Sequence, residues 1–242
     1  MSKILILLIS TITLLISNEA DEIIKKLDEN MRGESIYMQM SMEVKSMGHK
    51  RTIELESRSM GNEKSFVKIT YPPRERGITF LSLNNQMWQY VPKIERVIKI
   101  PPSMMLQNWM GSDITNDDMV KQNSLIEDYT ARILKKEGSR VTIELIPKDD
   151  ATVVWSKIVS YIDTNTYTSS KDIFYDEDGE EVRIFTYDKI EKYGKYYIPT
   201  LWEIRPTDKP ENYTKIELKE VKYDLEIPDK YFKKSALKRF SR

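Results

Sequence analysis

The residues that most often perform covalent chemistry are scarce in this chain. Its 242 residues include no Cys and one His. A thiolate nucleophile, a disulfide framework, a cysteine zinc site and a multi-histidine metal site are therefore excluded. His49 follows Met47-Gly48 in a stretch typical of a hairpin turn, with no sequence neighbour to orient it as a general base. We expect an exposed turn residue without a catalytic role.

The remaining candidates are carboxylates in short runs. Asp117-Asp118 suits the first turn of a helix, where the helix dipole favours negative charge. Asp176-Glu177-Asp178-Gly179 suits a hairpin tip, and its glycine stands in the wrong position for a calcium loop. The sequence also lacks a glycine-rich phosphate loop. It therefore predicts no catalytic residue, no metal site and no cofactor.

The charge balance argues against a nucleic-acid partner. The chain carries 38 Lys and Arg against 38 Asp and Glu, so its formal net charge is zero. A protein that neutralises phosphates usually has a basic surplus. We therefore expect no nucleic-acid binding.

The N-terminus has the pattern of a secretory signal. Met1-Ser2-Lys3 supplies a positive charge, and an apolar run follows from Ile4 to Ile16. A membrane-spanning helix needs about 20 apolar residues, and this run is shorter. The sequence predicts a signal peptide over residues 1–20 and one domain over residues 21–242. An uncleaved inner-membrane anchor is the alternative.

The domain opens with one helix and then changes to strands. Apolar residues recur at helical spacing from Asp21 to Arg32, and Gly33 is placed to end the helix. A two-residue alternation follows, which is typical of a strand with one buried face. Its apolar members are Ile36, Met38, Met40, Met42 and Val44.

Further strand-like runs fill most of the chain. About a dozen strands with almost no helix between them cannot form βαβ units, so we predict one strongly curved antiparallel sheet approaching a barrel. Such a sheet encloses space for a ligand. The additional runs span residues 51–58, 65–71, 78–83, 86–91, 96–100, 129–134, 140–146, 153–162, 168–175, 181–190, 196–205 and 213–225.

The segment 100–122 interrupts the strands. Pro101-Pro102 breaks the preceding strand, Ser103 is placed to cap a short helix, and Gly111 is placed to end it. A second helix is expected over residues 116–122, and Asp113 is expected to cap the turn before it. We expect the first helix to cover the mouth of the curved sheet as a lid, through Met104, Met105, Leu106, Trp109 and Met110.

The cavity wall is expected on the first strand and on a neighbour. Methionine is flexible and polarizable, so a methionine-rich wall accepts ligands of varied shape, although core filling is the alternative. The alternation alone leaves open which sheet face is concave. The expected wall residues are Ile36, Met38, Met40, Met42, Val44, Trp88 and Tyr90.

An ordered series of short motifs resembles the LolA-like outer-membrane lipoprotein-sorting proteins, over essentially all of the predicted domain. The resemblance implies an unclosed β-barrel with a helical lid, secreted to the periplasm, whose cavity receives the acyl chains of a lipoprotein or lipid. The motifs are Arg76-Gly77-Ile78-Thr79-Phe80-Leu81, Met87-Trp88-Gln89-Tyr90-Val91-Pro92, Arg96, Gly111-Ser112-Asp113, Pro199-Thr200-Leu201-Trp202, Ile227-Pro228 and Tyr231-Phe232.

The resulting hypothesis is a non-catalytic, monomeric periplasmic carrier that works toward the outer membrane. Its partners would be acyl chains, an inner-membrane transporter and an outer-membrane acceptor. The alternative is an envelope accessory protein that contacts a membrane transporter without carrying free lipid. For the basic C-terminal tail around Lys233-Lys234 and Lys238-Arg239, we expect a frayed, solvated end rather than a contact with anionic lipid.

Overall fold

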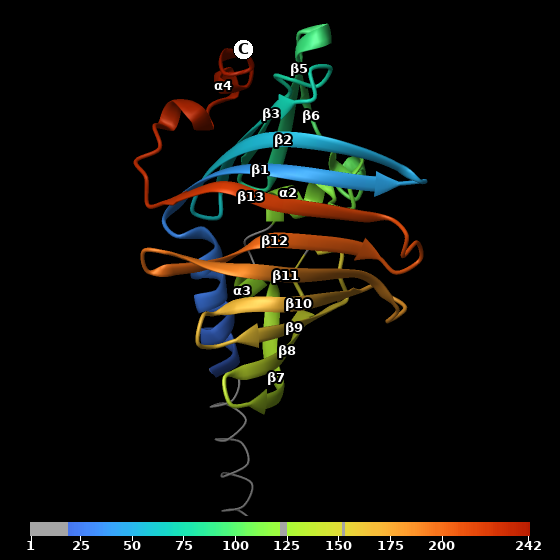
Figure 1. Ribbon diagram of the computed structural model, residues 1–242, viewed down its shortest axis with the longest axis vertical. Coiled ribbons are helices and arrows are strands. Elements are labelled where there is room, and N and C mark those ends of the chain that lie inside the picture. The colour runs from blue at the N-terminus through green and yellow to red at the C-terminus, as the bar shows by residue number, and fades with distance from the viewer. Residues whose placement is uncertain (1–18, 122–124, 152) are drawn as a thin grey trace, which may run out of the picture.

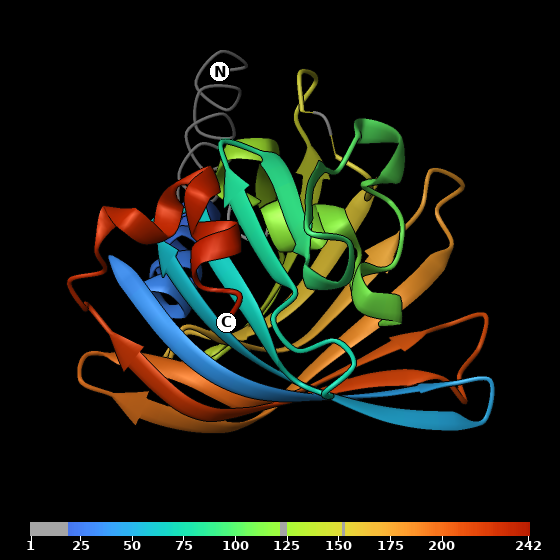
Figure 2. The same cartoon turned by 90° about the horizontal axis from the view of Figure 1, so that it is seen from above.

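The computed structural model describes residues 19–121, 125–151 and 153–242. Thirteen antiparallel strands form one sheet in the order β6-β5-β4-β3-β2-β1-β13-β12-β11-β10-β9-β8-β7 (Figure 1). The sheet curls into a trough whose two edges, β6 and β7, do not pair with each other (Figure 2). The predicted fold class, a mainly β chain in an unclosed β-barrel with a few helices, is confirmed.

The strand boundaries lie close to those predicted from the alternation. β9 is the largest difference: it begins at Lys157, because Val153 and Trp155 pack against a hydrophobic core instead of pairing in the sheet. The strands are β1 (Ser35–Ser46), β2 (His49–Met60), β3 (Lys64–Tyr71), β4 (Thr79–Leu83), β5 (Gln86–Val91), β6 (Arg96–Lys99), β7 (Tyr129–Glu137), β8 (Arg140–Pro147), β9 (Lys157–Asp163), β10 (Thr168–Tyr175), β11 (Glu181–Tyr193), β12 (Tyr196–Pro206) and β13 (Tyr213–Tyr223).

The helices are short apart from the one at the N-terminus, which is described over residues 19–32. That helix ends as predicted, since Gly33 has φ +58° and its N–H donates to the carbonyl of Glu29 at 2.8 Å. No helix within the described ranges is long and apolar enough to cross a membrane. The others are η1 (Pro92–Ile94), η2 (Pro102–Met104), η3 (Trp109–Gly111), α2 (Asn116–Lys121), α3 (Leu125–Asp128), η4 (Asp229–Phe232) and α4 (Lys234–Arg239).

The predicted signal peptide falls on residues outside the described ranges, except for its last two. Glu19 and Ala20 lie in the N-terminal helix. Glu19 forms an ion pair with Lys136, and Ala20 is fully buried.

Two meanders meet at the centre of the sheet. Strands β1 to β6 run outward in one direction and β13 back to β7 in the other, with β1 and β13 paired side by side. The segment between the two edge strands, residues 100–128, therefore has to travel from one edge of the trough to the other. It carries η2, η3, α2 and α3, and Figure 2 shows these green elements inside the curve of the sheet.

The concave face buries two hydrophobic cores. The first lies under β1 to β5, β12 and β13 and includes Met42, Ile53 and Ile198, together with Trp109 from the connecting segment. The second lies between the N-terminal helix and β7 to β10, and includes Ile24. Each half of the trough thus has its own core, and the space between them is the site described below.

The convex face of β3 to β5 is also covered. The C-terminal segment packs there, with Ala236 and Leu237 fully buried against Phe66 and Leu81. The hydroxyl of Thr79 donates to the carbonyl of Leu237 at 2.7 Å. The expected frayed C-terminal tail is therefore wrong: the apolar residues between its basic ones anchor it to the sheet.

We predict that Gly77→Ala destabilises the protein by about 1 to 3 kcal/mol, because Gly77 has φ +82° and an added Cβ would lie 2.4 Å from the carbonyl oxygen of Ser241. The matched control is Gly138→Ala, at φ +62° with open space around it, which should lose about 1 kcal/mol. Urea unfolding of both variants measures the difference. Equal losses would show that the C-terminal segment does not pack closely against Gly77.

Candidate functional site

A cavity of about 230 Å³ lies under the concave face, between the two cores. One side is the N-terminal helix with Leu27 and Met31, and the opposite side is the sheet. The wall is mostly apolar, and burial of apolar surface is what drives hydrocarbon into such a space. Other apolar wall residues are Ile36, Met38, Ile114, Leu125, Tyr129, Val153, Trp155, Ile158, Phe174, Phe185, Ile198, Trp202, Ile204 and Ile216.

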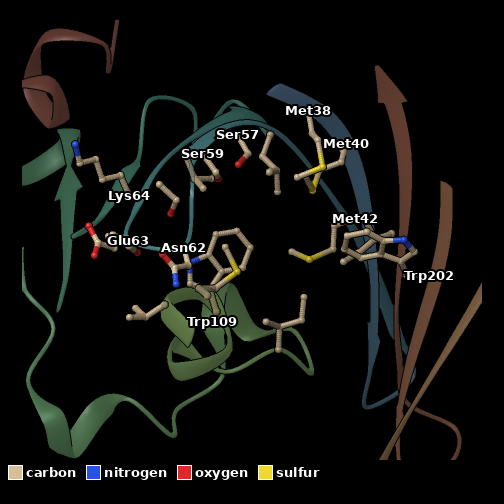
Figure 3. Close-up of a pocket in the computed structure, with 18 residues that line it drawn as sticks. Met38, Met40, Met42, Ser57, Ser59, Asn62, Glu63, Lys64, Trp109 and Trp202 are labelled. Atoms are coloured by element: carbon tan, nitrogen blue, oxygen red, sulfur yellow. The ribbon is translucent and has the colours of Figure 1, made fainter. Parts of the chain in front are cut away.

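A smaller cavity of about 60 Å³ adjoins the first. Figure 3 shows Met38, Met40 and Met42 in its wall, with Trp202 beyond them and Trp109 below. The two cavities therefore form one interrupted space under β1. The side chains that line both are Met38, Ser59, Ile114, Trp202 and Ile216.

The structure places four of the seven expected wall residues at these cavities. Met38 borders both, Met40 and Met42 border the smaller one, and Ile36 borders the larger one. Val44 shares their sheet face but is buried in the first core.

The expected place of Trp88 and Tyr90 is corrected by the structure. Both lie on the convex face, in the core formed with the C-terminal segment, while their neighbour Met87 faces the concave side. Strand β5 is buried on both faces, so its alternating pattern holds no information about which set of side chains faces inward.

The expected lid helix does not form as one helix. Residues 102–111 contain two short 3₁₀ turns, and Met110, inside the second turn, has φ +50°. Ser103 caps neither turn. The Asn108 side-chain amide donates to the carbonyl of Ser112 at 2.5 Å. The backbone N–H of Trp109 donates to the carbonyl of Ile114 at 2.6 Å. These bonds fold the segment back on itself, and such a tight turn is incompatible with a continuous helix.

The five expected lid residues consequently have different surroundings. Trp109 is 2 % exposed and borders the smaller cavity. Met105 and Met110 pack against the first core, whereas Met104 and Leu106 point to solvent, with Leu106 58 % exposed. Of the five expected lid residues, Trp109 is therefore the one that borders a cavity.

Arg183, on β11, is a central residue that the sequence analysis missed. Its side chain is 5 % exposed. The guanidinium lies 4.4 to 4.7 Å from the ring centres of Trp155, Phe174 and Phe185. It donates to both carboxylate oxygens of Asp118, at 2.6 and 2.9 Å. A planar guanidinium is suited to this combination of stacking and bidentate pairing.

The Arg183–Asp118 ion pair fastens the connecting segment to the sheet. Thr115 and Asp118 cap α2 reciprocally: the Thr115 N–H donates to the carboxylate at 2.7 Å, and the Asp118 N–H donates to the Thr115 hydroxyl at 3.1 Å. Burial opposes ionisation of Asp118, but the Arg183 charge and these hydrogen bonds outweigh it, so its pKa lies below the ordinary value.

Asp113 forms a second attachment rather than the turn cap that we expected. The Thr214 hydroxyl, on β13, donates to the Asp113 carboxylate at 2.7 Å and accepts from the Asp113 N–H at 2.8 Å. Arg183 also donates to the backbone carbonyl of Asp113 at 3.1 Å. The middle of the segment is therefore held to β11 and β13 by polar contacts.

Five Asp side chains lie in the wall of the larger cavity, and burial raises the pKa of two of them, Asp28 and Asp172. Burial raises the pKa of Asp28 to about 6, although its ion-pair partner Arg32, on the same helix, acts in the opposite direction. Burial also raises the pKa of Asp172, which accepts a hydrogen bond from Ser169 at 2.6 Å. Among the described residues no cluster of three His, Asp or Glu side chains is arranged to hold a metal ion. What this site offers chemically is an apolar space with a few paired polar groups.

Comparison with known proteins identifies a matching family and solved structures with the same fold. A family model described as "-like: Uncharacterized protein" matches residues 61–239, well over half of the chain. The chain belongs to that family and has a LolA-like fold. No curated protein matches the sequence.

Three solved structures share the fold. A domain named for outer membrane lipoprotein sorting, from Vibrio parahaemolyticus, is 22 % identical with a TM-score of 0.82, covering 92 % of this chain and 100 % of that one. A DUF1329 family protein from Desulfovibrio piger is 19 % identical with a TM-score of 0.84, covering 92 % and 99 %. A LolA superfamily protein from Nitrosomonas europaea is 22 % identical with a TM-score of 0.75, covering 90 % and 98 %.

We predict that Asp118→Asn destabilises this LolA-like protein by about 3 to 5 kcal/mol, because it leaves the charge of Arg183 buried without a counter-charge. Since the pKa of Asp118 is lowered in the folded state, the stabilisation is present above the unfolded-state pKa and is lost as the pH falls through the folded-state pKa. Urea unfolding at pH 7 and in acid measures both effects.

The control is Glu144→Gln, which removes an ion pair with Arg132, a side chain 68 % exposed. It should cost less than about 1 kcal/mol. A loss at Asp118→Asn no larger than at Glu144→Gln would contradict a structural role for the buried pair.

Proposed function

We propose that the protein is a non-catalytic periplasmic carrier that binds acyl chains of a lipoprotein or lipid and moves them toward the outer membrane. The observation that carries the proposal is the apolar cavity of about 230 Å³ under the trough. The LolA-like fold supports it, and so does the name of the Vibrio domain, which refers to lipoprotein sorting.

The free energies involved suit a carrier. Burying one CH₂ group contributes about 0.8 kcal/mol, so a dozen CH₂ groups contribute roughly 10 kcal/mol. A carrier has to match most of that amount to take a chain through water. It must also give the chain up, which requires an acceptor that binds it more tightly.

The cavity wall is adaptable where the two cavities meet. Met38 borders both, and unbranched methionine side chains change rotamer at little cost. If Met38 and Trp202 move apart, the two cavities join under β1. We propose that a long acyl chain enters the larger cavity and extends into the smaller one by displacing these side chains.

In this proposal the connecting segment is the lid. Its polar attachment to the sheet, through Asp113 and Asp118, lies in the middle of the segment. We propose that residues 102–111 move while residues 113–118 stay tethered to Arg183 and Thr214. The chain would be exported by its signal peptide, act as a monomer, receive cargo from an inner-membrane transporter and deliver it to an outer-membrane acceptor.

The alternative function, an envelope accessory protein that carries no free lipid, predicts a filled interior. The cavity between the two cores favours the carrier. Both functions remain compatible with contacts to a membrane transporter, and uptake of an acyl chain is what distinguishes them.

We predict that Met38→Asp weakens binding of a fluorescent acyl-chain probe by at least about 10-fold, because it places a charge where both cavities meet. Fluorescence titration of the purified protein measures the dissociation constant. Met38→Leu keeps the wall apolar and should bind the probe like the parent protein.

Met47→Asp is the matched control, since Met47 is 86 % exposed in the β1–β2 turn. It should leave probe binding unchanged. Native mass spectrometry of protein purified from its own envelope fraction should also detect a copurifying acylated molecule. A parent protein that arrives empty and takes up no added probe would refute the carrier function.

A second prediction concerns pH. Because the pKa of Asp28 is raised to about 6 by burial, a ligand that removes the remaining water from the cavity favours its protonated form. A neutral acyl ester should therefore bind roughly 3- to 10-fold more tightly at pH 5 than at pH 7.5. Asp28→Asn should reduce this dependence, leaving any contribution from Asp172. A parent protein with the same affinity at both pH values would contradict the prediction.

A further inference from the structure

One end of the molecule combines positive charge with exposed apolar side chains. Two chain segments form it: residues 92–99, which contain η1 and β6, and residues 227–242, which contain η4 and α4. We call them together the basic end. Figure 1 shows β5, β6 and α4 at the same end of the long axis. The two segments meet at Trp88: the amino group of Lys99, from the first segment, lies 5.7 Å from its ring centre. The amino group of Lys234, from the second segment, lies 4.5 Å from the same ring centre.

The basic end carries a net positive charge, in contrast to the chain as a whole. It has nine basic and two acidic side chains, whereas the whole protein is neutral. All nine basic residues are exposed, and none forms an ion pair with an acidic side chain in the parts of the chain that the structure describes. They are Lys93, Arg96, Lys99, Lys230, Lys233, Lys234, Lys238, Arg239 and Arg242.

Aliphatic side chains project between these charges. Ile94, Val97 and Ile98 are 55 %, 46 % and 40 % exposed. Every residue of β6 is exposed, and its outer edge has no partner strand among the described residues. These three side chains lie within eight residues that also carry three basic groups, so apolar and positively charged surface are combined there.

We propose that the basic end docks on an anionic lipid bilayer. The basic side chains would lie among the headgroups, and Ile94, Val97 and Ile98 would enter the interfacial region. The inference rests on the proposed function, in which cargo has to reach a membrane. Beyond that function, the inference specifies which surface of the protein contacts the membrane and that the membrane lipids are anionic.

The shape of the surface favours a bilayer over an acidic peptide. The aliphatic residues come from both faces of β6 and from a 3₁₀ turn, so they form a projecting edge rather than a groove. Neither cavity is lined by a residue of the basic end. The basic charges also come from two segments and cover an area, whereas a bound peptide strand would meet a line of charges.

The basic end is rigidly joined to the sheet and adjacent to the lid. Phe240 stacks on Tyr231 with ring centres 4.3 Å apart, and Lys68 donates to the carbonyl of Arg242 at 2.7 Å. The connecting segment over the cavities starts at Ile100, immediately after β6. Docking through β6 would therefore bring the start of the lid to the membrane surface.

The test is sedimentation with vesicles of phosphatidylglycerol and phosphatidylethanolamine, compared with vesicles of phosphatidylcholine. We expect the parent protein to bind the anionic vesicles and to release them as salt is raised. A Lys93→Gln, Arg96→Gln, Lys99→Gln variant should bind about 100-fold more weakly, at about 5-fold for each charge. A Lys234→Gln, Lys238→Gln variant should lose about 25-fold, and an Ile94→Ser, Ile98→Ser variant should also lose affinity.

The matched control is a Lys189→Gln, Ile190→Ser, Lys192→Gln, Lys195→Gln variant of the β11–β12 hairpin, which also exposes lysines and one Ile. It should bind vesicles like the parent protein. The proposal is overturned if the parent shows no preference for anionic vesicles, or if the control loses as much as the basic-end variants. It is likewise overturned if the parent binds an acidic protein of the envelope and no vesicle.

Binding of the acyl-chain probe separates this proposal from the proposed function. Each basic-end variant should bind the probe normally and should remain folded, although loss of the Lys99 and Lys234 contacts with Trp88 lowers the unfolding temperature slightly. A parent protein that binds the probe but no vesicle refutes docking alone, and one that binds vesicles but no probe refutes the carrier alone.

Discussion

The pairing of β1 with β13 is the contact on which the rest of the molecule depends. Without it the chain would be two separate meanders, each with one half of an apolar face. Their pairing makes one trough but leaves β6 and β7 as unjoined edges. A closed barrel of so many strands would surround a channel, whereas an open trough has to be covered from inside by other parts of the chain. The N-terminal helix and the connecting segment supply that cover.

Covering the trough with the N-terminal helix and the connecting segment explains why a cavity remains and why charged side chains are buried beside it. One helix and one irregular segment cannot fill a trough as completely as a second sheet, so space remains between the two cores. The connecting segment packs Trp109, Ile114 and Val120 into the first core. It is also attached through Arg183 and Asp118, whose charges are tolerated away from water because each satisfies the other.

The net charge of the protein is zero, but its charged residues are distributed unevenly over the molecule. The net excess of basic residues at one end implies an equal net excess of acidic residues in the rest of the chain. The total charge excluded a protein that is basic throughout, yet it held no information about a basic end.

The sequence by itself determined the local structure, that is, where strands form and where the N-terminal helix ends. A two-residue alternation identifies strands because side chains alternate across a sheet, and Gly33 ends a helix because glycine readily adopts positive φ. The motifs also led to the correct fold. Only the tertiary structure decided which face of β5 is concave, because β5 is buried on both faces and Trp88 and Tyr90 pack against the distant C-terminal segment. The same holds for Arg183, whose partner Asp118 is 65 residues away. Such pairings depend on how the sheet brings remote segments together, and short-range patterns do not encode that.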